Sequence, residues 1–191
     1  MEKIKTFSAK TVNLPNEDVD TDQIIPARFL TRQTIDGIGE CLFADWRFDK
    51  LGKPNEDFIL NQTESNDAGI LVAGNNFGCG SSREHAAWSL LDYGFRAIVS
   101  TSFADIFKNN SLKNGLITIV VDLETHKWLM EHPDSELIVD LENTEIIVEH
   151  GKKVCFPIDS FARYCLLNGV DQLGYMLSQE SEIIAYENQQ Q

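Results

Sequence analysis

The middle third of the chain alternates short apolar runs with helix-like stretches, and this alternation limits most strongly what the chain can fold into. Strands are expected at 69–73, 96–100 and 116–121, with helices at 82–93 and 103–108 between them. Apolar runs of this length separated by helices are typical of βαβ units, because parallel strands need a long crossover connection. The segment therefore predicts a parallel sheet with helices packed on it.

The flanking thirds add elements to this unit. A strand is expected at 5–12, and apolar residues that alternate with polar ones after residue 136 predict an antiparallel meander. Helices are expected at 160–167 and 171–187. A chain of 191 residues fits one domain. We therefore expect residues 1–191 to form a single α/β domain, a mostly parallel sheet with a β-meander, ending in a frayed tail at 188–191.

Charge and cysteine usage exclude several function classes. The chain has 16 Lys and Arg against 30 Asp and Glu, a net charge of −14, which disfavours nucleic acid and anionic membranes as partners. Its four cysteines contain no CxxC, and their spacing matches no closed metal or cluster site. The longest apolar runs are the length of core strands, far short of the ~20 residues of a membrane span. These features predict a soluble cytoplasmic protein with free thiols and no metal of its own.

The segment 75–85, which reads NNFGCGSSREH, concentrates the residues able to carry chemistry. Two adjacent hydroxyls, Ser81 and Ser82, precede Arg83 at the start of an expected helix, where backbone N–H groups and the helix dipole favour an anion. A guanidinium adds a fork that suits a carboxylate. The segment therefore predicts an anion site. The alternative is that Ser81 only caps the helix, because residues 81–84 fit the S-x-x-E capping box.

Familiar catalytic and nucleotide-binding motifs are absent from the sequence. Neither the Walker pattern, the Rossmann glycine pattern nor the G-x-S-x-G elbow occurs. The acidic residues Asp18, Asp20 and Asp22 begin like a calcium-binding loop, yet the required glycine and glutamate do not follow. We therefore interpret this run as a turn or a hydrogen-bonding platform.

Cys79 is a second candidate for reactivity. A thiol at a helix N-terminus near Arg83 is expected to have a lowered pKa, which would suit a nucleophile. The alternative is a buried cysteine that fills space as a small apolar residue. His85 is expected to support the core or the helix start, since no second metal ligand lies at helical spacing from it.

Four motifs together resemble a known family. They are DTDQIIP at 20–26, FADWRF at 43–48, NFGCGSSREHA at 76–86 and SFADIF at 102–107. On these motifs the chain resembles the small subunits of bacterial 3-isopropylmalate dehydratase, of the aconitase superfamily. The likeness covers nearly the whole chain and departs at Ala87, where relatives often carry proline. The resemblance implies an aconitase-like swivelling domain with layered β/β/α architecture.

The resemblance also implies a function. It indicates a lyase of leucine biosynthesis, a branch of branched-chain amino-acid biosynthesis, that interconverts 2-isopropylmalate and 3-isopropylmalate through 2-isopropylmaleate. The chain would form a heterodimer or a higher assembly with a large subunit that carries a [4Fe–4S] cluster, and it would hold no cofactor itself. Two alternatives stay open. One is the small subunit of a related hydro-lyase acting on homoaconitate, citraconate or a methylated malate, and the other is a non-catalytic binding domain of the same fold.

Site residues follow from the same resemblance, position by position. Ser81 corresponds to the catalytic base, and Ser82 and Arg83 correspond to residues that bind a substrate carboxylate. The loop after Pro26 resembles the segment that recognises the substrate side chain. Its candidate residues are Arg28, Phe29, Leu30 and Thr31. Phe29 and Leu30 either face an isopropyl group or pack the domain, and we expect Arg28 to point away from that group.

Overall fold

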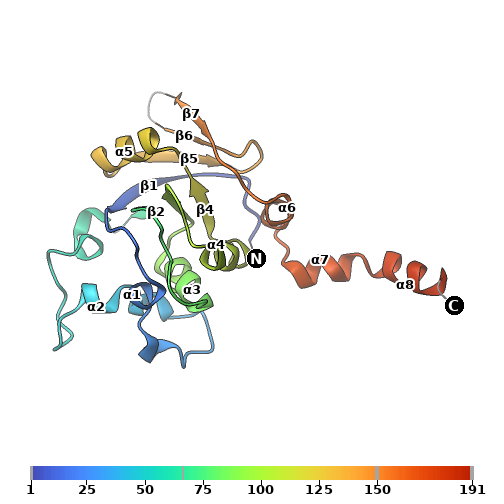
Figure 1. The fold of residues 1–191 in the computed structure, drawn as a ribbon, viewed down its shortest axis with the longest axis horizontal. Coiled ribbons are helices and arrows are strands. Elements are labelled where there is room, and N and C mark those ends of the chain that lie inside the picture. Colours follow the sequence, from blue (N-terminus) through green and yellow to red (C-terminus); the bar gives the residue numbers. More distant parts are fainter. Residues whose placement is uncertain (1, 66, 149–150, 190–191) are drawn as a thin grey trace.

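One curled sheet of seven strands organises the residues that the computed structural model describes, which are 2–65, 67–148 and 151–189 (Figure 1). The strand order is β4-β3-β2-β1-β5-β6-β7. The strands are β1 (Thr6–Leu14), β2 (Ala68–Ala73), β3 (Ala97–Ser100), β4 (Ile117–Val120), β5 (Glu136–Asp140), β6 (Glu145–Ile147) and β7 (Lys153–Cys155). The α-helices are α1 (Thr21–Ile24), α2 (Ala44–Arg47), α3 (Glu84–Tyr93), α4 (Asp105–Asn114), α5 (Leu123–Glu131), α6 (Ser160–Asn168), α7 (Gln172–Ser178) and α8 (Glu180–Gln189).

Strand β1 is where the sheet changes from parallel to antiparallel. The second half of β1 pairs in parallel with β2, with Val12 opposite Leu71. Its first half pairs antiparallel with β5, with Phe7 opposite Val139. Strands β2, β3 and β4 are parallel to one another, and β5, β6 and β7 form the meander. The predicted α/β class with a mostly parallel core and a meander is therefore confirmed. The meander continues the same sheet from β1.

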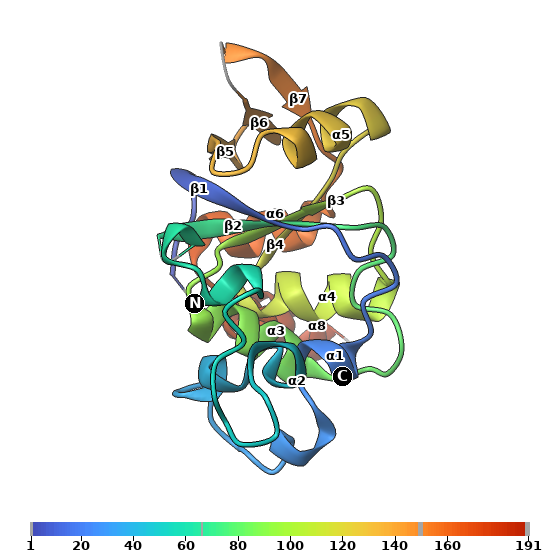
Figure 2. The ribbon, with the colours of Figure 1, turned by 90° about the vertical axis from the view of Figure 1, so that its left-hand side faces the viewer.

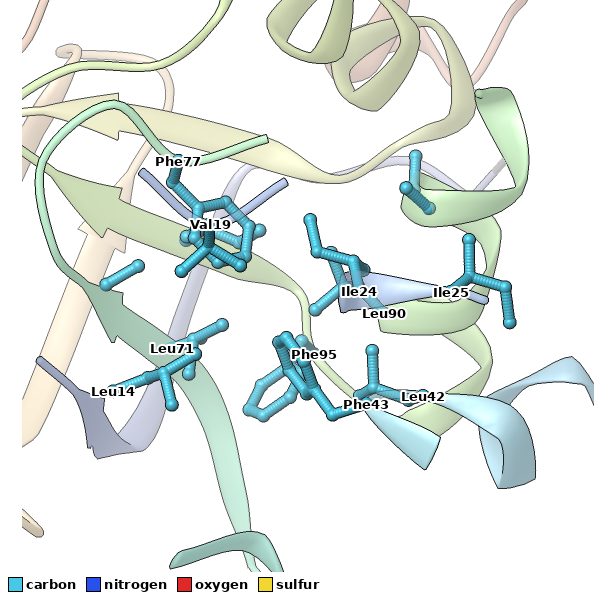
Figure 3. Close-up of a cluster of buried hydrophobic side chains, with 14 of the residues drawn as sticks. Leu14, Val19, Ile24, Ile25, Leu42, Phe43, Leu71, Phe77, Leu90 and Phe95 are labelled. Atoms are coloured by element: carbon cyan, nitrogen blue, oxygen red, sulfur yellow. The ribbon is translucent and has the colours of Figure 1, made fainter. Parts of the chain in front are cut away.

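Apolar residues cover both faces of the parallel strands. On β2, Leu71 faces a cluster that includes residues of α1 and α3, while Ile70 and Val72 face a second cluster on the side of α5 and α6. This alternation follows from the two-residue period of a strand. Figure 2 shows the parallel strands between α5 on one side and α1 and α3 on the other. Figure 3 shows the first cluster, where Phe43, Phe77 and Phe95 are fully buried. The central strands are thus buried on both faces, as parallel strands usually are.

Several helices differ from the sequence expectation. Helix α5 was not expected, and it forms because Asp122 caps it by accepting from the backbone N–H of Thr125 at 2.7 Å. Helix α4 runs six residues further than the expected 103–108, and it buries Leu112 near its end.

The expected single helix at 171–187 is two helices. Its first part, α7, ends where the Ser178 hydroxyl donates to the carbonyl of Tyr175 at 2.6 Å, a bond type that bends helices. Helix α8 includes Asn188 and Gln189. The last two positions of the tail expected at 188–191 lie outside the described residues.

The glycine-rich turn sets a requirement at Gly78 that stability measurements can check. Gly78 has φ +77°, and a Cβ there would overlap the ring of Phe107, which is 2% exposed and cannot move into solvent. We expect Gly78→Ala to lower the free energy of unfolding by about 1–3 kcal/mol more than Gly52→Ala. Gly52 is the matched control, because it has the same φ and open space around its Cβ position. Urea denaturation of both variants measures the difference, and equal losses would show that Phe107 moves aside freely.

Candidate active site

Three loops meet at the edge of the sheet where parallel strands end. They follow β1, β2 and β3 and span 15–22, 74–83 and 101–104. The carboxyl ends of parallel strands share one edge, which is where ligands bind in open α/β sheets. This arrangement places the glycine-rich segment, which follows β2, between the other two loops.

Backbone hydrogen bonds hold the glycine-rich segment on both sides. Its Gly78 N–H donates to the carbonyl of Val19 at 2.8 Å on one side. On the other side, Ala104 donates to the carbonyl of Phe77 at 3.1 Å. Val19 and Phe77 lie together in the buried cluster of Figure 3. The loop that carries Ser81 is therefore anchored at its root to two neighbouring loops.

Asp20 fixes the short helix α1 against this loop. Its carboxylate accepts from the Asp22 N–H at 2.6 Å, and its own N–H donates to the Gln23 side chain at 2.7 Å, which completes a capping box. Gly80, at φ +85°, packs so closely on Asp20 that a Cβ would overlap the carboxylate. The acidic run is thus a hydrogen-bonding platform, which confirms that interpretation.

Ser81 is exposed and is oriented by a buried threonine of α1. The Thr21 hydroxyl donates to the carbonyl of Ser81 at 3.0 Å and lies 3.3 Å from its hydroxyl oxygen. Thr21 is only 1% exposed, so its position is set by packing. The Ser81 hydroxyl consequently faces solvent with a fixed hydroxyl partner beside it.

The capping interpretation of Ser81 is wrong. Helix α3 begins at Glu84, two residues later than expected, and its N-cap is Arg83, for which no side-chain capping bond is found. Ser81 lies two residues before that N-cap, and its carbonyl already accepts from Thr21 and from the Arg83 N–H. The hydroxyl is therefore not consumed in starting the helix.

Arg83 forms an ion pair with Asp22, across 61 residues of sequence. The Asp22 carboxylate also accepts from the Ala27 N–H at 3.1 Å, so it joins Arg83 to the following loop. The bond from Arg83 holds the pKa of Asp22 below its ordinary value, and the same bond raises the pKa of Arg83. The pair uses one of the five guanidinium N–H donors and so leaves the fork able to bind a second carboxylate.

The loop after Pro26 starts with the 3₁₀ turn Ala27–Phe29. Arg28 turns to Asp45, with 2.6 Å between guanidinium and carboxylate, and stacks 4.6 Å from the centre of the Phe29 ring. Phe29 and Leu30 are half-buried and pack against the cluster of Figure 3, while Thr31 is exposed. The structure thus supports packing roles for Phe29 and Leu30 in the chain by itself.

A second link joins the loop to α3. The His85 ring nitrogen Nε2 lies 2.9 Å from the carbonyl of Arg32, and the ring packs 4.7 Å from that of Trp88. His85 therefore supports the helix start and the loop together.

An open pocket of about 920 Å³ lies beside the 3₁₀ turn Ala27–Phe29. It is lined by Arg28, Phe29 and residues of α2, but not by Ser81, Ser82 or Arg83. Ser81 and Ser82 are thus exposed and Arg83 is half-buried, all three outside this pocket.

The expected low pKa of Cys79 is wrong. Burial of the thiol raises its pKa, and the negative charges of Asp20 and Asp18 raise it further. Helix α3 starts five residues later, so the thiol is not at its N-terminus, and it donates instead to the carbonyl of Asp18 at 3.2 Å. Cys79 is a poor candidate for a nucleophile in this environment.

The described residues include no group of side chains placed to hold an iron–sulfur cluster. The four cysteines are all free: Cys41 and Cys165 are buried, Cys79 is half-buried and Cys155 is exposed. Within residues 2–65, 67–148 and 151–189, no three His, Cys, Asp or Glu side chains gather as a metal site. None of the helices in this described part of the chain is long and apolar enough to cross a bilayer.

Sequence reasoning missed two residues of this site. Thr21 contacts Ser81 and Asp22 pairs with Arg83, yet neither was expected to act there. Both residues belong to the motif DTDQIIP at 20–26, and this motif is the sequence signal for their role. The contacts themselves join residues 60 and 61 positions apart.

Comparison with known proteins identifies the family. A model described as the aconitase C-terminal domain matches residues 1–124. A 3-isopropylmalate dehydratase small subunit of Anaeromyxobacter sp. (strain K) is 53% identical over 187 residues, 98% of each chain. That of Herpetosiphon aurantiacus is 55% identical over 98% of this chain and 94% of its own length. A crystal structure of 3-isopropylmalate dehydratase from Methanocaldococcus jannaschii superposes with a TM-score of 0.67 at 25% identity, covering 96% of this chain and 99% of that one. The chain therefore belongs to the 3-isopropylmalate dehydratase small-subunit family and carries an aconitase C-terminal domain.

Proposed function

We propose that this chain is the small-subunit half of a cytoplasmic hydro-lyase of leucine biosynthesis, which interconverts 2-isopropylmalate and 3-isopropylmalate through 2-isopropylmaleate. One observation carries the proposal: the chain is more than half identical to small subunits of this enzyme over 98% of both lengths. The Ser81–Arg83 segment at the carboxyl edge of the sheet, with two exposed serines and a half-buried arginine, supports it with a chemical site.

The first contribution of this chain is to proton transfer. Dehydration removes a proton from the carbon beside a carboxylate and hydroxide from the neighbouring carbon, and rehydration adds them back in the opposite sense. We assign the proton transfer to the Ser81 hydroxyl oxygen. Serine is a weak base at its ordinary pKa, so its alkoxide needs stabilisation. The positive charge of Arg83, two residues on, can supply it. The Thr21 hydroxyl, 3.3 Å away, adds to it when its proton turns from the Ser81 carbonyl to the Ser81 hydroxyl oxygen.

Substrate orientation is the second contribution. We assign a substrate carboxylate to Arg83, whose guanidinium is kept in place by Asp22 and still has donors to offer. The Ser82 hydroxyl and the first N–H groups of α3 add neutral donors beside it. A rigid fork of this kind places the reacting carbon near Ser81 before the proton moves.

The remaining chemistry belongs to the partner in this proposal. The departing hydroxyl needs a Lewis or Brønsted acid, and the described residues around Ser81 include no metal site. We therefore place the [4Fe–4S] cluster on the large subunit. The exposure of Ser81 and Ser82 agrees with a site completed by a second chain.

Reconstitution tests the proposal. The purified chain alone is expected to be colourless, free of iron and inactive, and mixing it with the large subunit should produce hydration of 2-isopropylmaleate. Stoichiometric iron with activity in the isolated chain would overturn the two-chain proposal. A panel with citraconate and homoaconitate as substrates separates the related hydro-lyases, and absence of activity toward every member of the panel favours the non-catalytic alternative.

Residues 28–31 give a prediction about substrate choice. All candidate substrates share two carboxylates and a hydroxyl, so discrimination depends on what surrounds the remaining substituent. We expect Leu30→Arg to lower kcat/KM for isopropylmalate by about 10–200-fold, the range for losing one or two methyl contacts. Phe29→Ala should act in the same direction. Steady-state kinetics of the assembled enzyme measure both.

Leu123→Arg is the matched control, because Leu123 is 77% exposed on α5, away from this loop. Thermal unfolding of each variant separates loss of packing from loss of recognition, since Phe29 and Leu30 also pack the domain. Unchanged kcat/KM in both loop variants would assign specificity to the large subunit instead.

A further inference from the structure

We propose that the C-terminal arm, residues 172–189 (α7 and α8), is a docking segment that binds an apolar groove with a basic rim on the large subunit. Figure 1 shows the arm extending away from the sheet beyond α6. The proposal rests on the proposed function, because that function requires the large subunit.

The arm exposes a concentrated set of large apolar side chains. On α7 these are Leu173, Met176 and Leu177, which are 59–63% exposed and share one helix face at i, i+3 and i+4 spacing. Helix α8 adds the half-exposed Ile183 and Ile184 and the 64% exposed Tyr186. Single exposed apolar residues are normal on a surface, but a contiguous set marks an interaction site.

Contacts at the start of the arm set its direction. The Tyr175 ring packs edge-on against Phe161 at 5.0 Å and Tyr164 at 5.5 Å, both on α6. Asp171 caps α7 by accepting from the Gly174 N–H at 2.6 Å. Helices α7 and α8 have seven and ten residues, and isolated helices shorter than ~12–15 residues are marginal in water. A covering surface is therefore needed to stabilise them.

Charge indicates which surface covers the arm. After Arg163 the sequence has four acidic residues, Asp171, Glu180, Glu182 and Glu187, and no Lys or Arg. The arm of a second copy would carry the same negative charges, and a whole second copy carries −14, so self-association is disfavoured. An amphipathic acidic helix instead fits an apolar groove flanked by Lys and Arg.

The comparisons support the large subunit as this partner. The match to a relative named a small subunit spans 187 residues and 98% of this chain, so it extends through most of the arm. A segment that the family shares, and that the domain does not cover, is suited to the subunit contact its name implies.

Binding measurements with full-length proteins test the proposal. We expect Leu177→Glu and Ile184→Glu each to raise the Kd for the large subunit at least tenfold, and the double variant to raise it more. Leu123→Glu is the control, since Leu123 is an exposed leucine on α5, and its Kd should stay within about twofold of the unsubstituted chain. Charge reversal at Glu180 and Glu182 to Lys should weaken binding and reduce its salt dependence.

Activity titrations separate this proposal from the proposed function. The arm variants should need more large subunit for half-maximal activity and should reach the same maximal rate. Unchanged Kd in the double variant would overturn the arm proposal while leaving the enzymatic function intact. A chain that dimerises by itself and becomes monomeric in Leu177→Glu would also overturn it, because the arm would then bind a second copy. Normal binding without turnover would instead contradict the proposed function.

Discussion

Ser81→Ala is expected to lower kcat of the reconstituted enzyme by roughly 10²–10⁴-fold, the contribution typical of a positioned general base. The Ser81 hydroxyl lies exposed beside the buried Thr21 hydroxyl and makes no helix-capping bond, so its removal should leave the fold intact. Steady-state kinetics at saturating substrate measure kcat. The KM should change little, because the proposed carboxylate contacts are made by Ser82 and Arg83.

Ser8→Ala is the matched control, since Ser8 is an exposed serine in the first half of β1, outside the three loops that form the site. Its kcat and the Kd of its complex should equal those of the unsubstituted chain. Circular dichroism and large-subunit binding check that Ser81→Ala still folds and assembles. Near-normal turnover of an assembled Ser81→Ala enzyme would remove Ser81 from the proton step.

Arg83→Lys is expected to raise KM by about 10–200-fold with a smaller change in kcat. An ammonium keeps the charge but cannot reproduce the planar fork that pairs with a carboxylate. Hydrogen bonds to charged groups contribute about 1.5–3 kcal/mol, which corresponds to this range of KM. Initial rates over a wide range of substrate concentration measure the two constants separately.

Arg163→Lys provides the comparison for Arg83→Lys. The Arg163 guanidinium donates to the carbonyls of Leu141 and Glu142, so its replacement also loses guanidinium bonds, but away from the site. Its KM should be unchanged. If Arg83→Lys loses stability as Arg163→Lys does and keeps its KM, then the role of Arg83 is confined to holding Asp22.

Local pattern was enough to predict most elements of the fold. The strands at 69–73, 96–100 and 116–121 were expected within one residue of β2, β3 and β4 at each end, because a buried parallel strand is a short apolar run between turn residues. The helix α5 escaped prediction, since its residues are mostly polar and its start depends on a single capping aspartate. The break between α7 and α8 was not predicted either; it follows Ser178, whose hydroxyl donates to the carbonyl of Tyr175.

The candidate site was predicted in part. Ser81, Ser82 and Arg83 were found because three suggestive residues are adjacent in sequence. Two local interpretations of the same segment failed. The capping box does not form because the backbone stays non-helical through Arg83, and the pKa of Cys79 is raised because Asp18 and Asp20, from another loop, lie beside it.

The α/β class, the acidic charge and the position of the Ser81–Arg83 segment between a strand and a helix could all be predicted from the residues in order. These properties depend on composition and on periods of two to four residues, which a sequence displays directly. The place of β1 between β2 and β5 required the folded structure. The loop after β1 consequently brings Thr21 to Ser81 and Asp22 to Arg83. Those contacts join residues 60 and 61 positions apart. Strand order and loop packing bring these residues together, and neither is encoded in a local sequence pattern.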